Sequence, residues 1–155
     1  MDSGSRLSEL PEIFQGDRVV LHRLNKPLGE TLFLTTVAHE IRRRNPDCEI
    51  EIHSFWPLLF INNPDVVKSA EIREPNPPPG HCVDYSWPPA DDRHVLETIC
   101  ESAGITGQVE PRTYYYATDE ERQHARELTP RTSGRPLVVI HPFSGFFAAK
   151  TKQWD

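Results

Sequence analysis

The sequence is poor in cysteine and has no long apolar run. Its three cysteines, Cys48, Cys82 and Cys100, are odd in number and show no CxxC spacing, so neither a disulfide framework nor a zinc site is predicted. No apolar stretch approaches the roughly 20 residues of a membrane span, and residues 1–9 lack the basic and apolar regions of a signal peptide. We therefore expect a soluble protein in a reducing, cytoplasmic compartment.

Positive charge is also scarce. The chain holds 17 Lys and Arg against 23 Asp and Glu, which gives a net charge of −6. A nucleic-acid binder usually presents a basic face, whereas the basic run from Arg42 to Arg44 falls in the last turn of a predicted helix, where cations suit the helix dipole. We expect no nucleic-acid partner.

Glycine is sparse where a dinucleotide-binding loop would need it. The loop after the first predicted strand contains Gly29 alone, and the GxGxxG pattern requires three glycines. A dinucleotide-binding oxidoreductase domain is therefore a weak hypothesis.

What the sequence does contain is a strand, a Pro-Gly loop and an amphipathic helix in succession. Residues 18–24 are rich in β-branched and apolar residues between turn formers, and from Leu32 apolar residues recur at helical spacing up to the stop at Pro46. This βα unit places Glu30 where open α/β sheets bind ligands, after a strand and at the start of a helix, and we expect its side chain to be exposed. The apolar helix face is predicted to contain Phe33, Val37 and Ile41.

The length of 155 residues suits one ordinary domain with a core of its own. A Pro-rich loop is expected over residues 73–89, and its Tyr85 and Trp87 either grip a ligand or pin the loop to the body of the domain. Four further strands are predicted, at 48–53, within 66–72, at 114–116 and, as a buried strand, at 137–140. A short helix is expected from Pro57, and a second helix is expected to be capped by Asp91 and Asp92 and ended by Gly104. A third, solvent-facing helix is opened by the Thr118 to Glu121 capping box and runs to Leu128.

Three stretches together resemble glycosyltransferase family 9, the heptosyltransferase-like enzymes. They are LGETLFLTTVAHEIRRRNPDCEIEIH, the NNPDV that follows, and the closing VVIHPFSG with KQW. The resemblance implies a GT-B fold, in which two Rossmann-like domains face each other across a cleft. The chain would then comprise an N-terminal extension (1–17), a Rossmann-like acceptor-side domain (18–130), and a linker with the first strand and loop of a truncated donor-binding domain (131–155).

The resemblance also implies roles for individual residues. The family commonly has an aspartate proposed as catalytic base at the position of Glu30, and Gly29, Tyr85 and Trp87 would contact the acceptor. Without the resemblance, Glu30 is equally well explained as an acid that stabilises the first turn of a helix.

The donor's phosphates would be held near the end of the chain. Ser144, Gly145 and Lys152 match the family's phosphate loop best, although an inserted FFAAK lengthens the loop and makes Lys150 a rival for Lys152. His141 is expected to be a strand-end histidine and not a base.

The resulting hypothesis is sugar transfer, with heptose as one candidate sugar, from a nucleotide sugar to a glycan or lipopolysaccharide-type acceptor by a longer chain. The truncated chain alone is expected to be inactive. No metal or other cofactor is implied, no transmembrane segment is expected, and peripheral membrane contact is compatible with a lipid-linked acceptor. The alternative is a non-catalytic α/β binding module or degenerate fragment.

Overall fold

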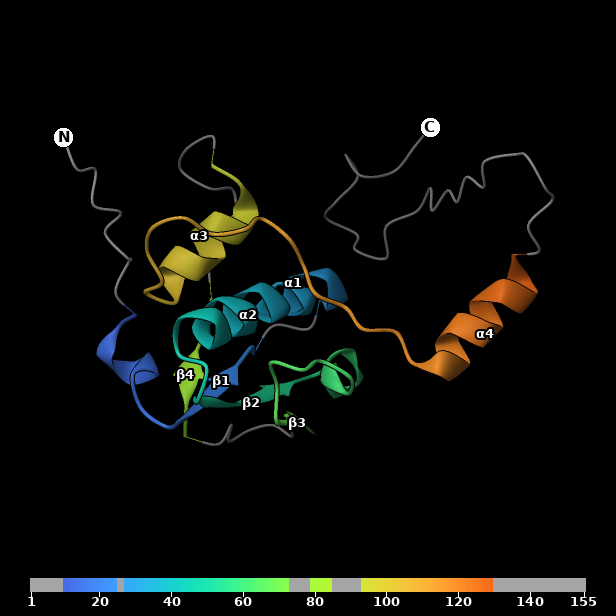
Figure 1. Ribbon diagram of the computed structural model, residues 1–155, viewed down its shortest axis with the longest axis horizontal. Helices are drawn as coiled ribbons and strands as arrows, with labels where there is room; N and C mark the ends of the chain where they lie inside the picture. Colours follow the sequence, from blue (N-terminus) through green and yellow to red (C-terminus); the bar gives the residue numbers. More distant parts are fainter. Residues whose placement is uncertain (1–9, 25–26, 73–78, 85–92, 130–155) are drawn as a thin grey trace. The chain divides into compact units, whose positions relative to one another are not determined.

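The computed structural model describes residues 10–24, 27–72, 79–84 and 93–129 (Figure 1). The chain divides into two compact units between Ala117 and Thr118, upstream of the predicted boundary at residue 130. The first unit contains, in chain order, η1 (Glu12–Phe14), β1 (Arg18–His22), α1 (Leu28–Leu32), α2 (Leu34–Arg44), β2 (Glu49–Ser54), η2 (Pro57–Phe60), β3 (Lys68–Glu71), β4 (His81–Cys82) and α3 (Val95–Ser102).

The first unit has a Rossmann-like α/β character, because its four strands form one parallel sheet in the order β3-β2-β1-β4. The chain steps outward from β1 to β2 and β3 and then returns to the other side of β1 to form β4. The strand order therefore reverses between β1 and β4. Such a switch point, at the carboxyl ends of the strands, is where open α/β sheets bind ligands.

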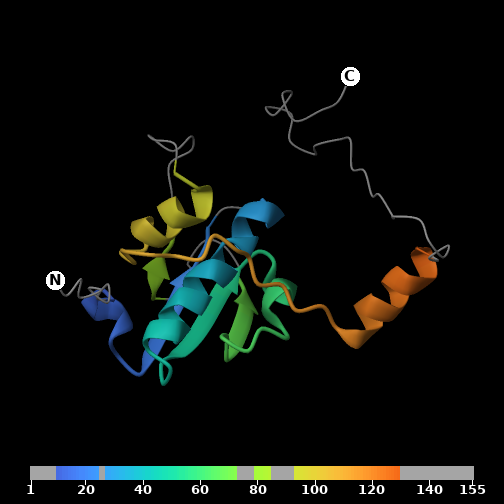
Figure 2. The same cartoon turned by 45° about the horizontal axis from the view of Figure 1, so that its top comes forward.

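One face of the sheet is apolar and is covered by α2 and α3, which lie on the same side in both views (Figures 1 and 2). Burial of this apolar surface is the main stabilising contribution to the domain. The predicted strand-helix unit is confirmed, and its buried helical face follows the 3.6-residue period. The fully buried residues at this interface include Leu21, Leu34, Val37, Ala38, Ile41, Ile50, Ile52, Val83 and Ile99.

The other face of the sheet is polar. Glu51 is 3% exposed and accepts hydrogen bonds from Lys68 at 2.6 Å and from Arg18, while His53 lies 2.7 Å from it. The Lys68 hydrogen bond, helped by those from Arg18 and His53, outweighs burial and lowers the pKa of the Glu51 carboxyl to about 2. The parallel sheet thus has one hydrophobic and one ion-paired face.

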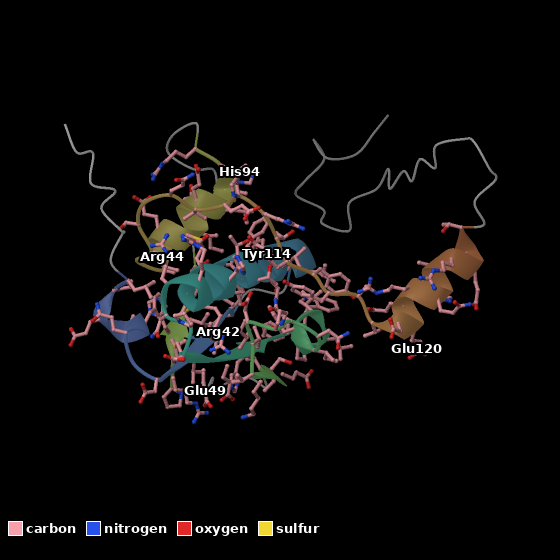
Figure 3. All side chains as sticks on the ribbon, in the orientation of Figure 1. Arg42, Arg44, Glu49, His94, Tyr114 and Glu120 are labelled. Atoms are coloured by element: carbon pink, nitrogen blue, oxygen red, sulfur yellow. The ribbon has the colours of Figure 1, made fainter. Side chains whose placement is uncertain are left out.

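An extended strap, residues 106–116, crosses the polar side of α2 (Figure 3). Thr36 donates to the Arg112 carbonyl at 2.7 Å, and the Tyr114 amide donates to Oγ1 of Thr35 at 2.9 Å. At the end of the helix, Arg44 donates to the Thr106 carbonyl at 2.8 Å. Among the described residues, the Arg112 carbonyl is the one partner of the buried Thr36 hydroxyl, so the strap satisfies a polar group that the helix leaves unbonded.

The NNPDV stretch joins three parts of the domain. Asn63 donates to the Tyr114 carbonyl at 3.3 Å and accepts from the Asp65 amide at 2.9 Å. Oδ2 of Asp65 lies 2.9 Å from Nδ1 of His39, whose ring stacks on Tyr114 with 3.9 Å between centroids. The motif therefore holds the loop before β3 against α2 and the strap.

Several predicted boundaries differ from the structure. The first strand ends at His22 and not at Leu24, and helix begins at Leu28, with a break at Phe33 that leaves this side chain only half-buried. The stretch from Pro57 is a 3-10 helix, and the strand predicted within 66–72 is β3. These shifts reflect end effects that local pattern does not fix.

Two further predictions, on the start of a helix and on a strand at residues 114–116, were wrong. The helix predicted from Asp91 and Asp92 begins instead after His94, whose ring accepts from the Leu96 amide at 3.2 Å while Glu97 completes a capping box. Residues 114–116 form no strand, because their backbone serves the strap. The predicted extension contributes two side chains to the core, Leu10 and Phe14. Gly104 ends α3 as predicted, with φ of +83°.

The described part of the second unit is α4 (Asp119–Leu128). Thr118 and Glu121 form the predicted capping box, with the Glu121 amide donating to Thr118 at 3.0 Å. None of the helix's side chains is buried, so the solvent-facing helix is confirmed. Within the described ranges, no helix is both long and apolar enough to cross a membrane.

Candidate functional site

A buried arginine lies at the switch point of the sheet. Arg23 directly follows β1 and is 1% exposed, yet its guanidinium meets acceptors from two other segments. Nη1 donates to the Val83 carbonyl at 2.9 Å and to Oδ1 of Asp84 at 3.0 Å, and Nη2 donates to Oε2 of Glu30 at 2.6 Å. Burying a guanidinium is costly unless it is paired, and here two carboxylates and a carbonyl supply the pairing.

Glu30 occupies the first turn of α1, as the sequence predicted, and its side chain is 34% exposed. The position of Glu30 follows from the local sequence. Pro27 lies directly before the helix and has a restricted φ, so the helix begins at the next residue. Among the residues that the structure describes, none bonds Oε1, the second oxygen of Glu30. One carboxylate oxygen is thus held by Arg23 and the other faces outward.

Asp84 supplies the second carboxylate of the cluster, from the segment that follows β4. Its side chain is 63% exposed, in contrast to the buried guanidinium that it bonds. Cys82, on β4, is also exposed. Partial desolvation of its sulfur by neighbouring atoms, with the nearby Asp84 charge, raises the pKa of the Cys82 thiol. The thiol is therefore not an activated nucleophile.

The cluster carries one positive and two negative charges. A carboxylate held by a guanidinium and open on one side can accept a proton from, or a hydrogen bond from, a hydroxyl group. In the described ranges, no group of three or more His, Cys, Asp or Glu side chains is placed to hold a metal ion. The outward carboxylate oxygens of this cluster can accept hydrogen bonds from hydroxyl groups.

Apolar side chains flank the cluster at the carboxyl edge of the sheet. Leu24 and Leu28, on either side of the loop after β1, are 45% and 47% exposed, and Trp56, just after β2, is 43% exposed. The edge thus offers an apolar surface as well as the carboxylates.

Of the predicted acceptor contacts, Gly29 lies beside Glu30 in α1 and is exposed, with open space where a Cβ would be. Tyr85 and Trp87 lie outside the described residues. So do the predicted donor-binding residues Ser144, Gly145 and Lys152, together with Lys150, His141, Asp91, Asp92 and residues 137–140.

Arg23 and Asp84 were not predicted as site residues. A single arginine at the end of an apolar strand has no local signature of burial, because charged residues are usually exposed. Asp84 follows a strand of two residues that the Pro-rich composition of 73–89 concealed. The strand order brings the residues that follow β1 and β4 together, and that order could not be read from the sequence because β4 was not predicted.

The sequence matches no protein-family model, and no curated protein or solved structure matches it significantly. The resemblance to glycosyltransferase family 9 therefore stays a prediction from the motifs.

Proposed function

We propose that residues 10–117 form the acceptor-side domain of a GT-B glycosyltransferase, with Glu30 as the base that takes the proton of the acceptor hydroxyl. The observation that carries the proposal is the position of Glu30. It lies at the carboxyl edge beside the switch point, with Oε2 held by Arg23 at 2.6 Å and Oε1 outward. A general base must reach the hydroxyl while keeping a fixed orientation. The bond from Arg23 fixes the carboxylate through Oε2, and Oε1 is left to reach the hydroxyl.

The proposed reaction is a single displacement. The acceptor oxygen forms a bond to the anomeric carbon of a nucleotide sugar, the bond from that carbon to the phosphate oxygen breaks, and the nucleotide leaves with the electron pair. The acceptor proton passes to Glu30. By the resemblance, Ser144, Gly145 and Lys152 would contact the donor's phosphates.

In this scheme Arg23 is a positioning residue, because it contacts Glu30 and not the reacting atoms. Its bonds to the Val83 carbonyl and to Asp84 fix the guanidinium from the opposite side. Asp84, being exposed, is placed to accept hydrogen bonds from further hydroxyls of a glycan acceptor.

A second candidate is a non-catalytic binding module that recognises a glycan at the same edge. It is favoured by the ion pair itself, because a carboxylate already bonded to a buried guanidinium can serve as a structural anchor for α1. Both candidates use the same surface, and they differ in whether Glu30 does chemistry.

The test uses the polypeptide as its gene encodes it. UDP-, GDP-, CMP- and ADP-activated sugars are mixed with mono- and oligosaccharide acceptors, including lipopolysaccharide core oligosaccharide, and transferred sugar is measured by mass spectrometry. Glu30→Gln is expected to cut transfer by at least about 100-fold. The matched control is Glu49→Gln, which removes the same charge from an exposed side chain at the amino end of β2 (Figure 3).

Equal transfer by the wild type and Glu30→Gln would refute the base assignment. Absence of transfer with every donor, combined with acceptor-induced NMR shifts at residues 24–30 and 84, would favour the binding module. Absence of both transfer and shifts would exclude both candidates.

A further inference from the structure

A histidine whose ring has no hydrogen-bond partner among the described residues is buried in the sheet beside the candidate site. His22, the last residue of β1, is 5% exposed, and neither of its ring nitrogens is bonded by any described residue. Its ring fills the space above Gly80, where an added Cβ would come within 2.6 Å of Nε2. Buried polar atoms are almost always bonded, so this arrangement calls for an explanation.

The groups that face His22 do not favour a positive charge there. From β2, its register partner His53 bonds to Glu51, which is already held by Lys68 and Arg18. From β4, the register partner is the thiol of Cys82, and the neighbouring His81 also has an Nε2 without a described partner. The His81 ring lies edge-on to Phe14, with 5.4 Å between centroids.

The strand β4, which contains His81 and pairs with β1 next to His22, is weakly attached to the sheet. β4 has two residues and pairs with β1 along one edge. Beyond it, the Val83 amide donates to the His22 carbonyl at 2.9 Å, and Arg23 bonds the Val83 carbonyl and Asp84. Loss of β4 from the sheet would therefore also remove two of the acceptors around Arg23.

We propose that β4 is an acid-released latch, in which protonation of His22 and His81 detaches residues 80–84 from β1 and opens the switch-point site. A charged imidazolium at His22 would be buried without an acceptor, and at the half-buried His81 the buried Nε2 would have no acceptor among the described residues. The two charges would also repel each other. Detachment exposes both rings to water and relieves both costs. The latch is closed near neutral pH and opens on mild acidification.

The titration of both groups runs in the required direction. Burial, with His53 and His81 nearby, lowers the pKa of His22 from its ordinary 6.5, and burial lowers the pKa of His81. The detached or unfolded state therefore binds more protons once the pH falls below about 6.5, and the closed state loses stability from there downward. Each histidine can contribute at most about a tenfold change in the closing equilibrium per pH unit.

The proposal is tested on the full chain by amide hydrogen exchange, which does not depend on any transferase activity. Between pH 7.5 and pH 5, after correction for intrinsic rates, protection of the Val83 amide is expected to fall at least tenfold. Protection of Ile50 and Ile52, in the central strand β2, should fall much less. A ring-proton NMR titration should show that the midpoint of His22 lies below its ordinary 6.5.

Variants separate the latch from general acid sensitivity. The double variant His22→Gln/His81→Gln should lose most of the pH dependence at Val83, whereas His124→Gln, which changes an exposed histidine on α4, should retain it. Unchanged Val83 protection at pH 5, or an ordinary titration of His22 near 6.5, would overturn the proposal. The ring titration uses the wild type, so a decision is reached even if the double variant does not fold.

Discussion

The guanidinium of Arg23 donates to the backbone carbonyl of Val83 at 2.9 Å and so joins the ends of two neighbouring strands through a side chain. The two residues are 60 positions apart in the sequence. The strand β4 has two residues and few backbone hydrogen bonds to β1. The bond from Arg23 adds a further attachment just beyond the end of β4.

Replacing Arg23 should therefore destabilise the whole domain. Arg23→Met keeps the length of the side chain but removes its donors from the Val83 carbonyl and from two carboxylates. We expect a loss of about 2–3 kcal/mol in the free energy of unfolding, measured by urea denaturation. Arg126→Met, at an exposed position on α4, should change stability by less than about 0.5 kcal/mol. Equal effects of the two substitutions would contradict the role assigned to Arg23.

Two glycines should respond to alanine with opposite signs. At Gly80 a Cβ would lie 2.6 Å from Nε2 of His22 and 2.7 Å from the Val20 carbonyl oxygen, and the backbone atom cannot move aside cheaply. Gly80→Ala is expected to cost about 1–3 kcal/mol, as overpacking does. Gly29 has open space around it in the first turn of α1, so Gly29→Ala should stabilise by about 0.5 kcal/mol. Thermal unfolding of both variants checks the prediction, which fails if both shift in the same direction.

Glu51 should make stability depend on pH in the acid range. Its pKa is about 2 in the folded protein and ordinarily 4.5, so its contribution is complete above about 4.5 and is lost as the pH falls toward 2. Glu51→Gln should lower stability by about 2 kcal/mol at pH 7 and by progressively less below pH 4.5. Urea unfolding at several pH values measures this difference. The matched control is Glu49→Gln, which removes a carboxylate from an exposed position on the same strand.

The helix α4 should depend on its cap more than buried helices do. It has no buried side chain to stabilise it, and ten residues are few for a helix in water. Thr118→Ala removes the acceptor of the Glu121 amide and should cost about 1 kcal/mol of helix stability. The helical Cα chemical shifts of residues 119–128 should decrease accordingly, whereas Thr118→Ser, which retains the hydroxyl, should preserve them. Unaltered shifts in Thr118→Ala would show that something other than the cap holds the helix.

Local features were predictable from the sequence. The alternation around Ile50 and Ile52, the capping box at Thr118 and the glycine after α3 each encode their structure within a few residues. The placement of Glu30 between strand and helix was predictable for the same reason, because turn residues mark both boundaries.

Non-local features were not predictable. The strand β4 is defined by its pairing with β1 and not by its own two residues. Burial of Arg23 depends on acceptors that lie 7 and 61 positions away, and the three tyrosines, despite their β-propensity, are used by the strap. The candidate site was thus half predicted. Glu30 was identified from local sequence, whereas Arg23 was not, because its burial depends on the order of the strands.

The strap also sets when the domain can finish folding during translation. Its bond from the Tyr114 amide to Thr35 spans 79 residues, so at about 5–20 residues per second roughly 4–16 s pass between the synthesis of the two partners. Until then, water must satisfy the hydroxyl of Thr36, which is fully buried in the finished domain and donates to the Arg112 carbonyl of the strap. The side of α2 that the strap later covers is therefore exposed when the sheet and the helix leave the ribosome. A chaperone that binds the incomplete chain would bind it on that side.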